Sequence, residues 1–123
     1  NIEIETKIED NCLIYADKKQ MIQVFNNLIK NAIQAVQSDE KGLIIIELTK
    51  DNTSVTLKIK DNGRGIDNEM KEKIFSPNFT TKSSGMGLGL AIVKSIIETN
   101  KGEIWFVSEE GKGTEFYIKF TKA

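Results

Sequence analysis

The stretch LIIIELTKDNTSVTLKIKDNGRGID, residues 43–67, determines how the fold is organised. Its first two thirds are two β-branched apolar runs joined by the turn-forming DNTS, a pattern that predicts a β-hairpin. The DNG at 61–63 is itself a common hairpin signal. A returning strand is not expected after it, because Ile66, Met70 and Ile74 recur every fourth residue, which is helical spacing. The sequence therefore predicts that the chain leaves the sheet here through an irregular loop.

The same two periodicities predict further elements on either side. Alternating apolar residues indicate strands, and apolar residues three and four apart indicate helices. Because strands and helices do not alternate regularly, we expect a two-layer α+β sandwich, with a mixed, largely antiparallel sheet and helices on one face. The predicted strands cover 2–8 (with one face buried), 12–15, 43–50, 54–60, 103–108 and 114–120, and the predicted helices cover 18–36, 67–74 and 88–98.

The first predicted helix has a capped start and two kinds of stripe. Asp17 is expected as the N-cap, with Gln20 completing a capping box. Asn27 and Asn31 are four residues apart and share one face. This polar stripe is either a solvated helix face or a source of amide oxygens for a hard cation such as Mg²⁺. The residues expected to face the core are Ile22, Phe25, Ile29, Ala32, Ile33 and Val36.

Composition limits the possible functions. The 123 residues suit one domain, 1–123, and the net charge of -1 gives no reason to expect a nucleic-acid partner. The absence of histidine excludes serine–histidine catalysis, and one cysteine cannot form an internal disulfide. No apolar run approaches the roughly 20 residues of a membrane span, so we expect a cytoplasmic domain without membrane contact. Because it begins with asparagine, we expect a piece of a longer protein.

Three glycine clusters lie at 61–65, 85–89 and 111–113. An ordinary turn accounts well for the third cluster, which has strands on both sides. It accounts least well for GMGLG, which precedes an apolar helix and exposes backbone N–H groups where an anion such as phosphate is favoured. Neither a dinucleotide-binding fingerprint nor a P-loop fits the spacing, so a nucleotide would have to bind by a third route.

Five motifs together resemble the catalytic and ATP-binding domain of bacterial sensor histidine kinases, in the wider ATPase superfamily of gyrase, heat-shock chaperone and mismatch-repair proteins (the Bergerat-type ATP-binding fold). The resemblance covers residues 23–116. In order, the N box is NNLIKNAIQA, the first G box DNGRGI, the F box IFSPNFTTK, the second G box GMGLGL and the third GKGTEF. Each motif is weak alone, but five in this order are specific. The short lid with FTTK is most similar to nitrogen-sensor-like kinases.

The resemblance implies a site for ATP and Mg²⁺. Asn31 would hold Mg²⁺ through its amide oxygen, and Asn27 would support it near the phosphates. Asp61 would accept a hydrogen bond from the exocyclic amine of adenine, and Thr114 would help to bind the base. The alternative for Asp61 is an Asx-type turn residue. Lys82 is the candidate cation that would reach the γ-phosphate from the lid. The alternative, that Lys82 is simply an exposed loop lysine, has equal weight.

The glycines of the first two G boxes would keep side chains away from the ligand. Gly63 and Gly65 would let backbone pass close to the base, and Gly87 and Gly89 would present N–H groups to the phosphates. Residues 76–86 would form the ATP lid. The same boxes add Ile66, Gly85 and Leu88 to the implied nucleotide-binding set.

The implied reaction transfers the γ-phosphoryl group of ATP to a histidine. The acceptor would belong to a dimerisation domain of the parent kinase, and a response regulator would act downstream. The fragment would be monomeric and the parent homodimeric. Whether the parent is anchored in a membrane stays open. Gln34 and Ala35 stand where many members carry a basic and an aromatic residue, and Asn27 where hydrolytic relatives carry glutamate. Two alternatives are a nucleotide-dependent interaction switch of the anti-sigma-factor type and a degenerate domain that no longer binds ATP.

Overall fold

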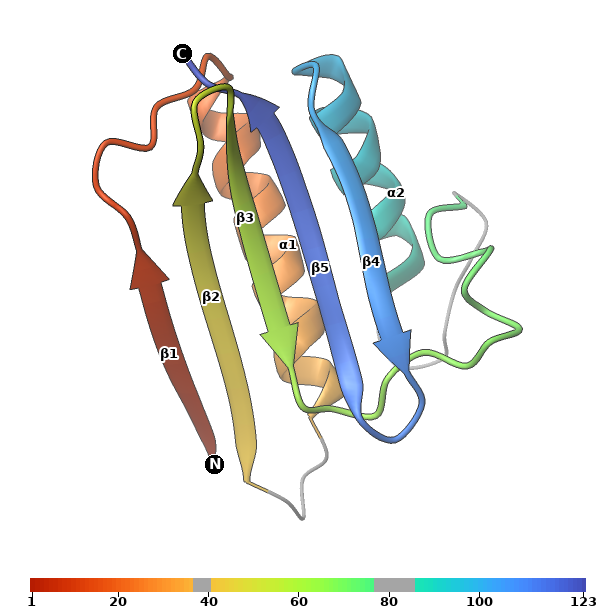
Figure 1. Cartoon of the computed structure of the whole chain (residues 1–123). Coiled ribbons are helices and arrows are strands. Elements are labelled where there is room, and N and C mark those ends of the chain that lie inside the picture. Colours follow the sequence, from red (N-terminus) through yellow and green to blue (C-terminus); the bar gives the residue numbers. More distant parts are fainter. Residues whose placement is uncertain (37–40, 77–85) are drawn as a thin grey trace.

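The computed structural model describes residues 1–36, 41–76 and 86–123, with the backbone alone at 86–88 (Figure 1). Its described strands form one sheet in the order β1-β2-β3-β5-β4, in which the β1–β2 pair is parallel and the other pairs are antiparallel. Both described helices lie on one face of this sheet (Figure 1), which confirms the predicted α+β two-layer class. The elements are β1 (Ile2–Ile8), α1 (Lys18–Ala35), β2 (Gly42–Lys50), β3 (Ser54–Asp61), α2 (Met86–Thr99), β4 (Glu103–Glu109) and β5 (Gly113–Thr121).

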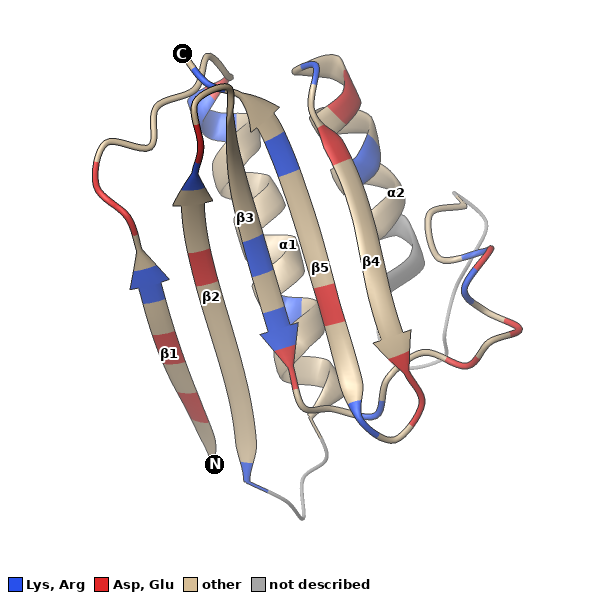
Figure 2. Cartoon of the chain, in the orientation of Figure 1, with Lys and Arg blue, Asp and Glu red and all other residues tan. Residues whose placement is uncertain are grey.

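The core lies between the helices and the sheet. Ile44 of β2, Ile59 of β3 and Ile118 of β5 point inward, and Leu28 of α1 and Val93 of α2 meet them. Because side chains alternate across a strand, the opposite face of the sheet carries the polar residues. Figure 2 shows basic and acidic residues interleaved over the strands. No helix of the described residues is long and apolar enough to cross a membrane.

The start of α1 is capped as predicted, but Gln20 completes its capping box only through the side chain of Asn100. Asp17 Oδ1 accepts a hydrogen bond from Gln20 N at 3.0 Å. The Asp17 N–H donates to Asn100 Oδ1 at 3.1 Å, and Asn100 Nδ2 donates to Gln20 Oε1 at 2.9 Å. Asn100 follows directly after α2. One asparagine therefore ties the first turn of α1 to the end of α2.

The predicted core face of α1 is wrong at three of its six residues. Ile22, Phe25 and Ile33 are exposed, whereas Ala32 is buried and Ile29 packs against the core, as expected. The sequence of this helix contains two apolar stripes. The stripe that faces the sheet is the one with small side chains, because they let the helix and the sheet approach closely. The residues buried on α1 are Val24, Leu28, Asn31, Ala32 and Ala35.

Two predicted elements are absent from the described residues. Residues 12–15 form no strand, and their one backbone bond outside regular elements runs from Ala123 N to Leu13 O at 2.8 Å. Residues 67–74 form successive turns instead of a helix. Met70 N donates to Asp67 O and Lys73 N to Met70 O, each at 2.9 Å. A helix needs overlapping bonds to the fourth preceding carbonyl, and these bonds follow one another end to end.

The first strand has the predicted bounds but not the predicted burial. All seven residues of β1 are exposed, including Ile2, Ile4 and Ile8. β1 is an edge strand that pairs with β2 alone within the described sheet. Helix α1 packs over β2, β3 and β5. The alternation of this strand was thus a correct signal for a strand and a wrong signal for a buried face.

Candidate functional site

A cavity of about 240 Å³ opens at the end of the sheet where β3 ends and β5 begins. The carboxyl end of α1 and the segment after β3 form its sides. Most of its surface is apolar, and its buried polar groups are Asn31, Asp61 and Thr114. The lining residues of this cavity are Asn31, Ala35, Asp61, Arg64, Gly65, Ile66, Asp67, Met70, Ile74, Leu90, Glu110, Thr114 and Phe116.

Asp61 is the most deeply placed charged group of the cavity. It is the last residue of β3 and only 4% exposed. Its Oδ1 accepts a hydrogen bond from Gly63 N at 2.8 Å, which is the Asx turn expected as the alternative. Burial raises the pKa of this carboxyl, while hydrogen bonds from the Gly63 and Thr114 backbones and the nearby Arg64 charge act in the opposite direction. The turn and a carboxylate that faces the cavity therefore coexist.

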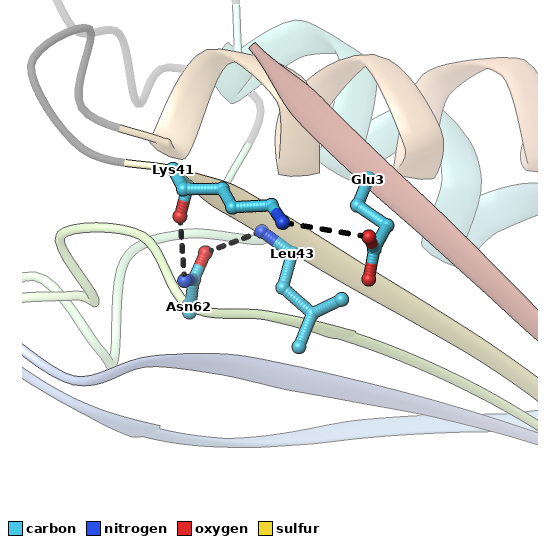
Figure 3. Close-up of polar contacts among 4 residues, drawn as sticks. All are labelled: Glu3, Lys41, Leu43 and Asn62. Atoms are coloured by element: carbon cyan, nitrogen blue, oxygen red, sulfur yellow. Dashed lines mark hydrogen bonds and ion pairs between the residues drawn. The ribbon is translucent and has the colours of Figure 1, made fainter.

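Asn62 fixes the loop to the sheet (Figure 3). Its side chain is not among those that line the cavity. Its Oδ1 accepts from Leu43 N at 2.8 Å, and its Nδ2 donates to Lys41 O at 3.1 Å. Lys41 Nζ lies 3.6 Å from Glu3 Oε1 on β1. The side chain of Asn62 thus extends the pairing of β2 and β3 beyond their ends and leaves its neighbour Asp61 aimed at the cavity.

The loop that follows is held on two sides. Arg64 N donates to Ala35 O at 2.9 Å, and Gly111 N donates to Arg64 O at 2.7 Å. On the β4 side, Ile66 N donates to Ser108 Oγ at 2.8 Å. These bonds connect the loop to the end of α1 and to the β4–β5 hairpin. The hydroxyl of Ser108 also lies 2.8 Å from Thr114 Oγ1, so it joins the loop to the start of β5.

Glycine is required where this loop meets its neighbours. A Cβ atom at Gly63 would lie 2.3 Å from Ala35 O, which is closer than real atoms approach. At Gly65, φ is +72° and a Cβ atom would lie 2.2 Å from Glu109 O. Both glycines therefore serve the packing of the loop, besides any role toward a ligand.

Helix α1 contributes buried amides to the same end of the molecule. Asn31 is 7% exposed and lines the cavity, so it does not lie on a solvated face. Among the described residues, Asn31 Nδ2 and Gln34 Oε1 are buried and have no hydrogen-bond partner. Asn27 lies beside the first turn of α2, where a Cβ atom at Gly89 would be 3.9 Å from its Oδ1. The polar stripe therefore faces the junction between the two helices.

The predicted site residues fall into three groups. One group lines the cavity and consists of Asn31, Asp61, Gly65, Ile66 and Thr114, with Gly63 in the same loop. A second group lies where α1 meets the start of α2 and consists of Asn27, Gly87, Leu88 and Gly89. Lys82 and Gly85 lie outside the described residues.

Several wall residues were not singled out from the sequence as binding residues. Met70, Ile74, Leu90 and Phe116 line the cavity. The four-residue spacing of Met70 and Ile74 was recognised in the sequence, but it was assigned to a helix that the structure does not form. Ser108 gave no signal, because a lone serine in a strand is common, and its role depends on its register opposite Thr114.

The donor set can be compared with the needs of a metal ion. In the parts of the chain that are described, no group of three or more His, Cys, Asp or Glu could hold a metal. Asn31 is different, because its buried Nδ2 has no partner among the described residues and can donate to an anion. An amide oxygen is also a ligand that suits a hard cation. Mg²⁺ usually shares its coordination between few protein oxygens, phosphates and water. An amide of this kind fits Mg²⁺ that arrives with a phosphate ligand.

Comparison with known proteins gives consistent similarities. A sequence model of the family described as histidine kinase-, DNA gyrase B- and HSP90-like ATPase matches residues 16–123. The sensor histidine kinase ZraS of Escherichia coli (strain K12) is 42% identical over 105 residues, which are 85% of this chain and 22% of ZraS. The chain spans about a fifth of the length of the curated relatives it matches.

Solved structures agree with the sequence relatives. The nucleotide-free catalytic domain of the histidine kinase ThkA superposes with a TM-score of 0.86 and 37% identity, covering 98% of this chain and 80% of that domain. Histidine kinase ThkA in complex with the response regulator protein TrrA gives a TM-score of 0.78 and 35% identity, covering 99% of this chain and 34% of that chain. Similarity to the nitrogen-sensor-like subgroup stays a prediction.

Proposed function

Since this chain belongs to the family of histidine kinase-, DNA gyrase B- and HSP90-like ATPases, as an ATPase domain of the histidine kinases of two-component systems, we propose that it binds Mg·ATP and donates the γ-phosphoryl group to a histidine on a separate domain. The observation that carries this proposal is the buried carboxylate of Asp61 on an otherwise largely apolar cavity. The apolar wall suits a purine ring, and the carboxylate suits a ring substituent that donates a hydrogen bond.

In this proposal Asp61 selects the base. Its carboxylate accepts a hydrogen bond from the exocyclic amine of adenine, and a base with an acceptor at that position would be repelled. A hydrogen bond to a charged acceptor contributes about 1.5–3 kcal/mol. Thr114, buried beside Asp61, helps to bind the same edge of the base. Gly63 and Gly65 keep the loop backbone near the ring.

The phosphates would lie between α1 and the first turn of α2. Helix N-termini present unpaired N–H groups to anions, and Gly87 and Gly89 are in that turn. Asn31 would hold Mg²⁺ through Oδ1, and Asn27 would support it. When bound, Mg²⁺ neutralises phosphate charge and so favours transfer of the γ-phosphoryl group. Lys82 remains the candidate cation from the lid.

The transfer itself needs a partner. The chain contains no histidine, so we place the acceptor on a dimerisation domain of the parent kinase. An imidazole nitrogen attacks the γ-phosphorus and forms a P–N bond, while the P–O bond to the β,γ-bridging oxygen breaks. ADP leaves with the electrons of that bond, and the imidazole releases its N–H proton to water. A response regulator is the proposed downstream acceptor, since the similar kinase ThkA has been crystallised with one. The sensor-kinase relatives favour this reaction over an anti-sigma-type switch.

Calorimetric titration with ADP, with and without Mg²⁺, tests the proposal. Asp61→Ala should abolish detectable binding, because it removes the acceptor for the adenine amine and also the acceptor that holds Gly63 N. Asn31→Ala should bind ADP with an affinity that hardly depends on Mg²⁺. Asn26→Ala and Asp10→Ala are the matched controls, since both residues are exposed and lie outside the cavity.

The controls should bind like the original chain. Unchanged ADP affinity in the Asp61→Ala variant, with its fold verified by circular dichroism, would remove the proposed base contact. Equal affinity of the original chain for ADP and GDP would argue against adenine selection by Asp61.

A further inference from the structure

A second cavity, of about 310 Å³, lies at the end of the molecule where α1 begins and α2 ends (Figure 1). Its lining includes Lys18 and Met21 from the first turns of α1, and Ile97 from near the end of α2. It shares no lining residue with the cavity that contains Asp61. This second cavity is therefore a separate site, and the proposed function gives it no role.

The second cavity has a buried floor and a cover outside the regular elements. Val24 of α1 and Ile118 of β5 belong to the floor, and each is 2% exposed. The cover is the segment at 12–16, which runs between β1 and α1 without regular secondary structure. Its even-numbered residues line the cavity, whereas Leu13 and Tyr15, which alternate with them, are exposed. A segment that belongs to neither the sheet nor the helices thus lies between this apolar floor and solvent.

A cavity of this kind is unfavourable when it is empty. Every lining residue except Cys12 and Lys18 has an apolar side chain, so a water molecule inside would find few of the polar partners that it needs. Lining atoms that face empty space also lose dispersion contacts. Since an apolar cavity of roughly 150 Å³ holds one benzene molecule, the second cavity has room for an apolar body of about ten carbon atoms.

The mouth of the second cavity adds one charge to this apolar lining. Lys18 is exposed and is the one charged residue among those that line the cavity. Its ammonium group has no ion pair within the described part of the chain. The neighbouring carboxylate of Asp17 accepts a hydrogen bond from Gln20 N at the start of the helix. We propose that the second cavity binds an apolar monocarboxylate, with its hydrocarbon body inside and its carboxylate at the ammonium group of Lys18.

Decanoate, used below its critical micelle concentration, is the probe for this site. In NMR spectra of the original chain, added decanoate should shift the methyl resonances of Val24, Leu57 and Ile118, which line the second cavity. The methyl resonances of Ile66 and Ile74, which line the cavity of Asp61, should not shift. Octanoate, which is shorter by two methylene groups, should bind about tenfold more weakly, because each buried methylene group contributes to affinity.

Calorimetric titrations of variants test the two parts of the ligand separately, with decanol as the uncharged counterpart of decanoate. Lys18→Met should weaken decanoate binding about two- to fivefold, the effect of one exposed ion pair, and leave decanol binding unchanged. Lys19→Met is the matched control, since Lys19 is exposed, adjacent and absent from the lining. Ala16→Phe, with its fold verified by circular dichroism, should fill the cavity and abolish binding of both molecules.

Three results would overturn the inference. One is that decanoate leaves the methyl resonances of Val24, Leu57 and Ile118 in place. Another is that folded Ala16→Phe binds decanoate like the original chain, which would place the binding elsewhere. The third is that decanol binds as tightly as decanoate and Lys18→Met affects neither, which would make the occupant an uncharged molecule. None of them bears on ADP binding at Asp61, so the proposed function fails or survives independently.

Discussion

At Asp61, burial and hydrogen bonding act on one carboxyl group in opposite directions. Burial is the larger effect and raises the pKa above its ordinary value of 3.8, so the folded state favours the protonated form. Ionisation of Asp61 therefore destabilises the fold as pH rises through this raised pKa. The side chain of Asn keeps the oxygen that accepts from Gly63 N and has no charge.

We predict that Asp61→Asn is at least as stable as the original chain at pH 7. The difference in melting temperature should shrink as pH falls below 3.8, where the carboxyl is protonated in both the folded and the unfolded chain. ADP affinity should fall by at least about 100-fold, because an amide donor would face the adenine amine. Melting curves of both proteins from acidic to neutral pH, with ADP titrations at pH 7, measure both effects. A variant that is clearly less stable at neutral pH would contradict the assigned direction of the pKa shift.

Residue by residue, the sequence located the polar groups of the site better than its walls. Asp61 and Asn31 could be named because each stands in a motif with a fixed spacing, and both proved to be buried at one cavity. Ser108 could not be named, because its contacts with Ile66 and Thr114 depend on strand register and loop path, which no local pattern encodes.

Among the elements, the two G-box segments differ in why they contain glycine. At Gly63 a methyl group would collide with backbone, since Ala35 O would be 2.3 Å away. At Gly89, in the helical first turns of α2, the nearest described atoms would be those of Asn27 at 3.9 Å, an ordinary contact. The first glycine is required by the fold, whereas the second leaves space on the side that faces the polar stripe of α1.

We therefore predict opposite effects of two alanine substitutions. Gly63→Ala should lower the free energy of unfolding by about 1–3 kcal/mol, because the loop or the end of α1 must move. Gly89→Ala should raise it by about 0.5–1 kcal/mol, as expected when alanine replaces glycine within a helix. Gly89→Ala should still weaken ADP binding if phosphates approach this turn. Urea denaturation and ADP titration of both variants provide the measurements, and equal destabilisation by the two changes would refute the distinction.

The end of α2 contains a conformation that glycine would adopt more easily than the residue present. Lys101 has φ of +64°, and Gly102 N donates to Ile97 O at 2.8 Å while Lys101 N donates to Glu98 O at 3.0 Å. This is a Schellman motif, in which the residue after the helix cap is usually glycine. We predict that Lys101→Gly stabilises the chain by about 1 kcal/mol, whereas Lys101→Ala does not. Thermal denaturation distinguishes them, and an equal gain from alanine would show that the charge, and not the backbone, was unfavourable.

The elements that were predicted wrongly share a physical cause. Long periodic segments such as α1 and the β2–β3 hairpin were predicted nearly to their ends, because many residues contribute to each pattern. Residues 12–15 and 67–74 are short, and a short apolar run can be buried by neighbours in any backbone conformation. Ile74 is buried in a series of turns, for example. Burial alone therefore does not decide the type of a short element.

At the scale of the whole molecule, the two ends of the sheet have different roles. At one end, Asn100 joins the start of α1 to the end of α2 through side-chain hydrogen bonds. At the other end, α1 finishes and α2 begins (Figure 1). The cavity with Asp61 lies there, and residues of both helices and of β3 and β5 line it. The link made by Asn100 therefore lies at the end of the helices opposite the cavity, where the proposed ligand would bind.

In the proposed function this chain is a phosphoryl donor, and its 123 residues contain no histidine that could be the acceptor. With no histidine in its 123 residues, the chain should bind Mg·ATP and yet gain no acid-labile phosphate when it is incubated with γ-labelled ATP. Adding the histidine-bearing dimerisation domain of the parent kinase as a separate polypeptide should place the label on that domain, because positioning and electrostatics by this chain are what the transfer requires. Asp61→Ala should abolish that labelling, and Asp10→Ala should not. Autoradiography of the separated polypeptides gives the answer, and stable label on this chain alone would mean that the acceptor has been misassigned.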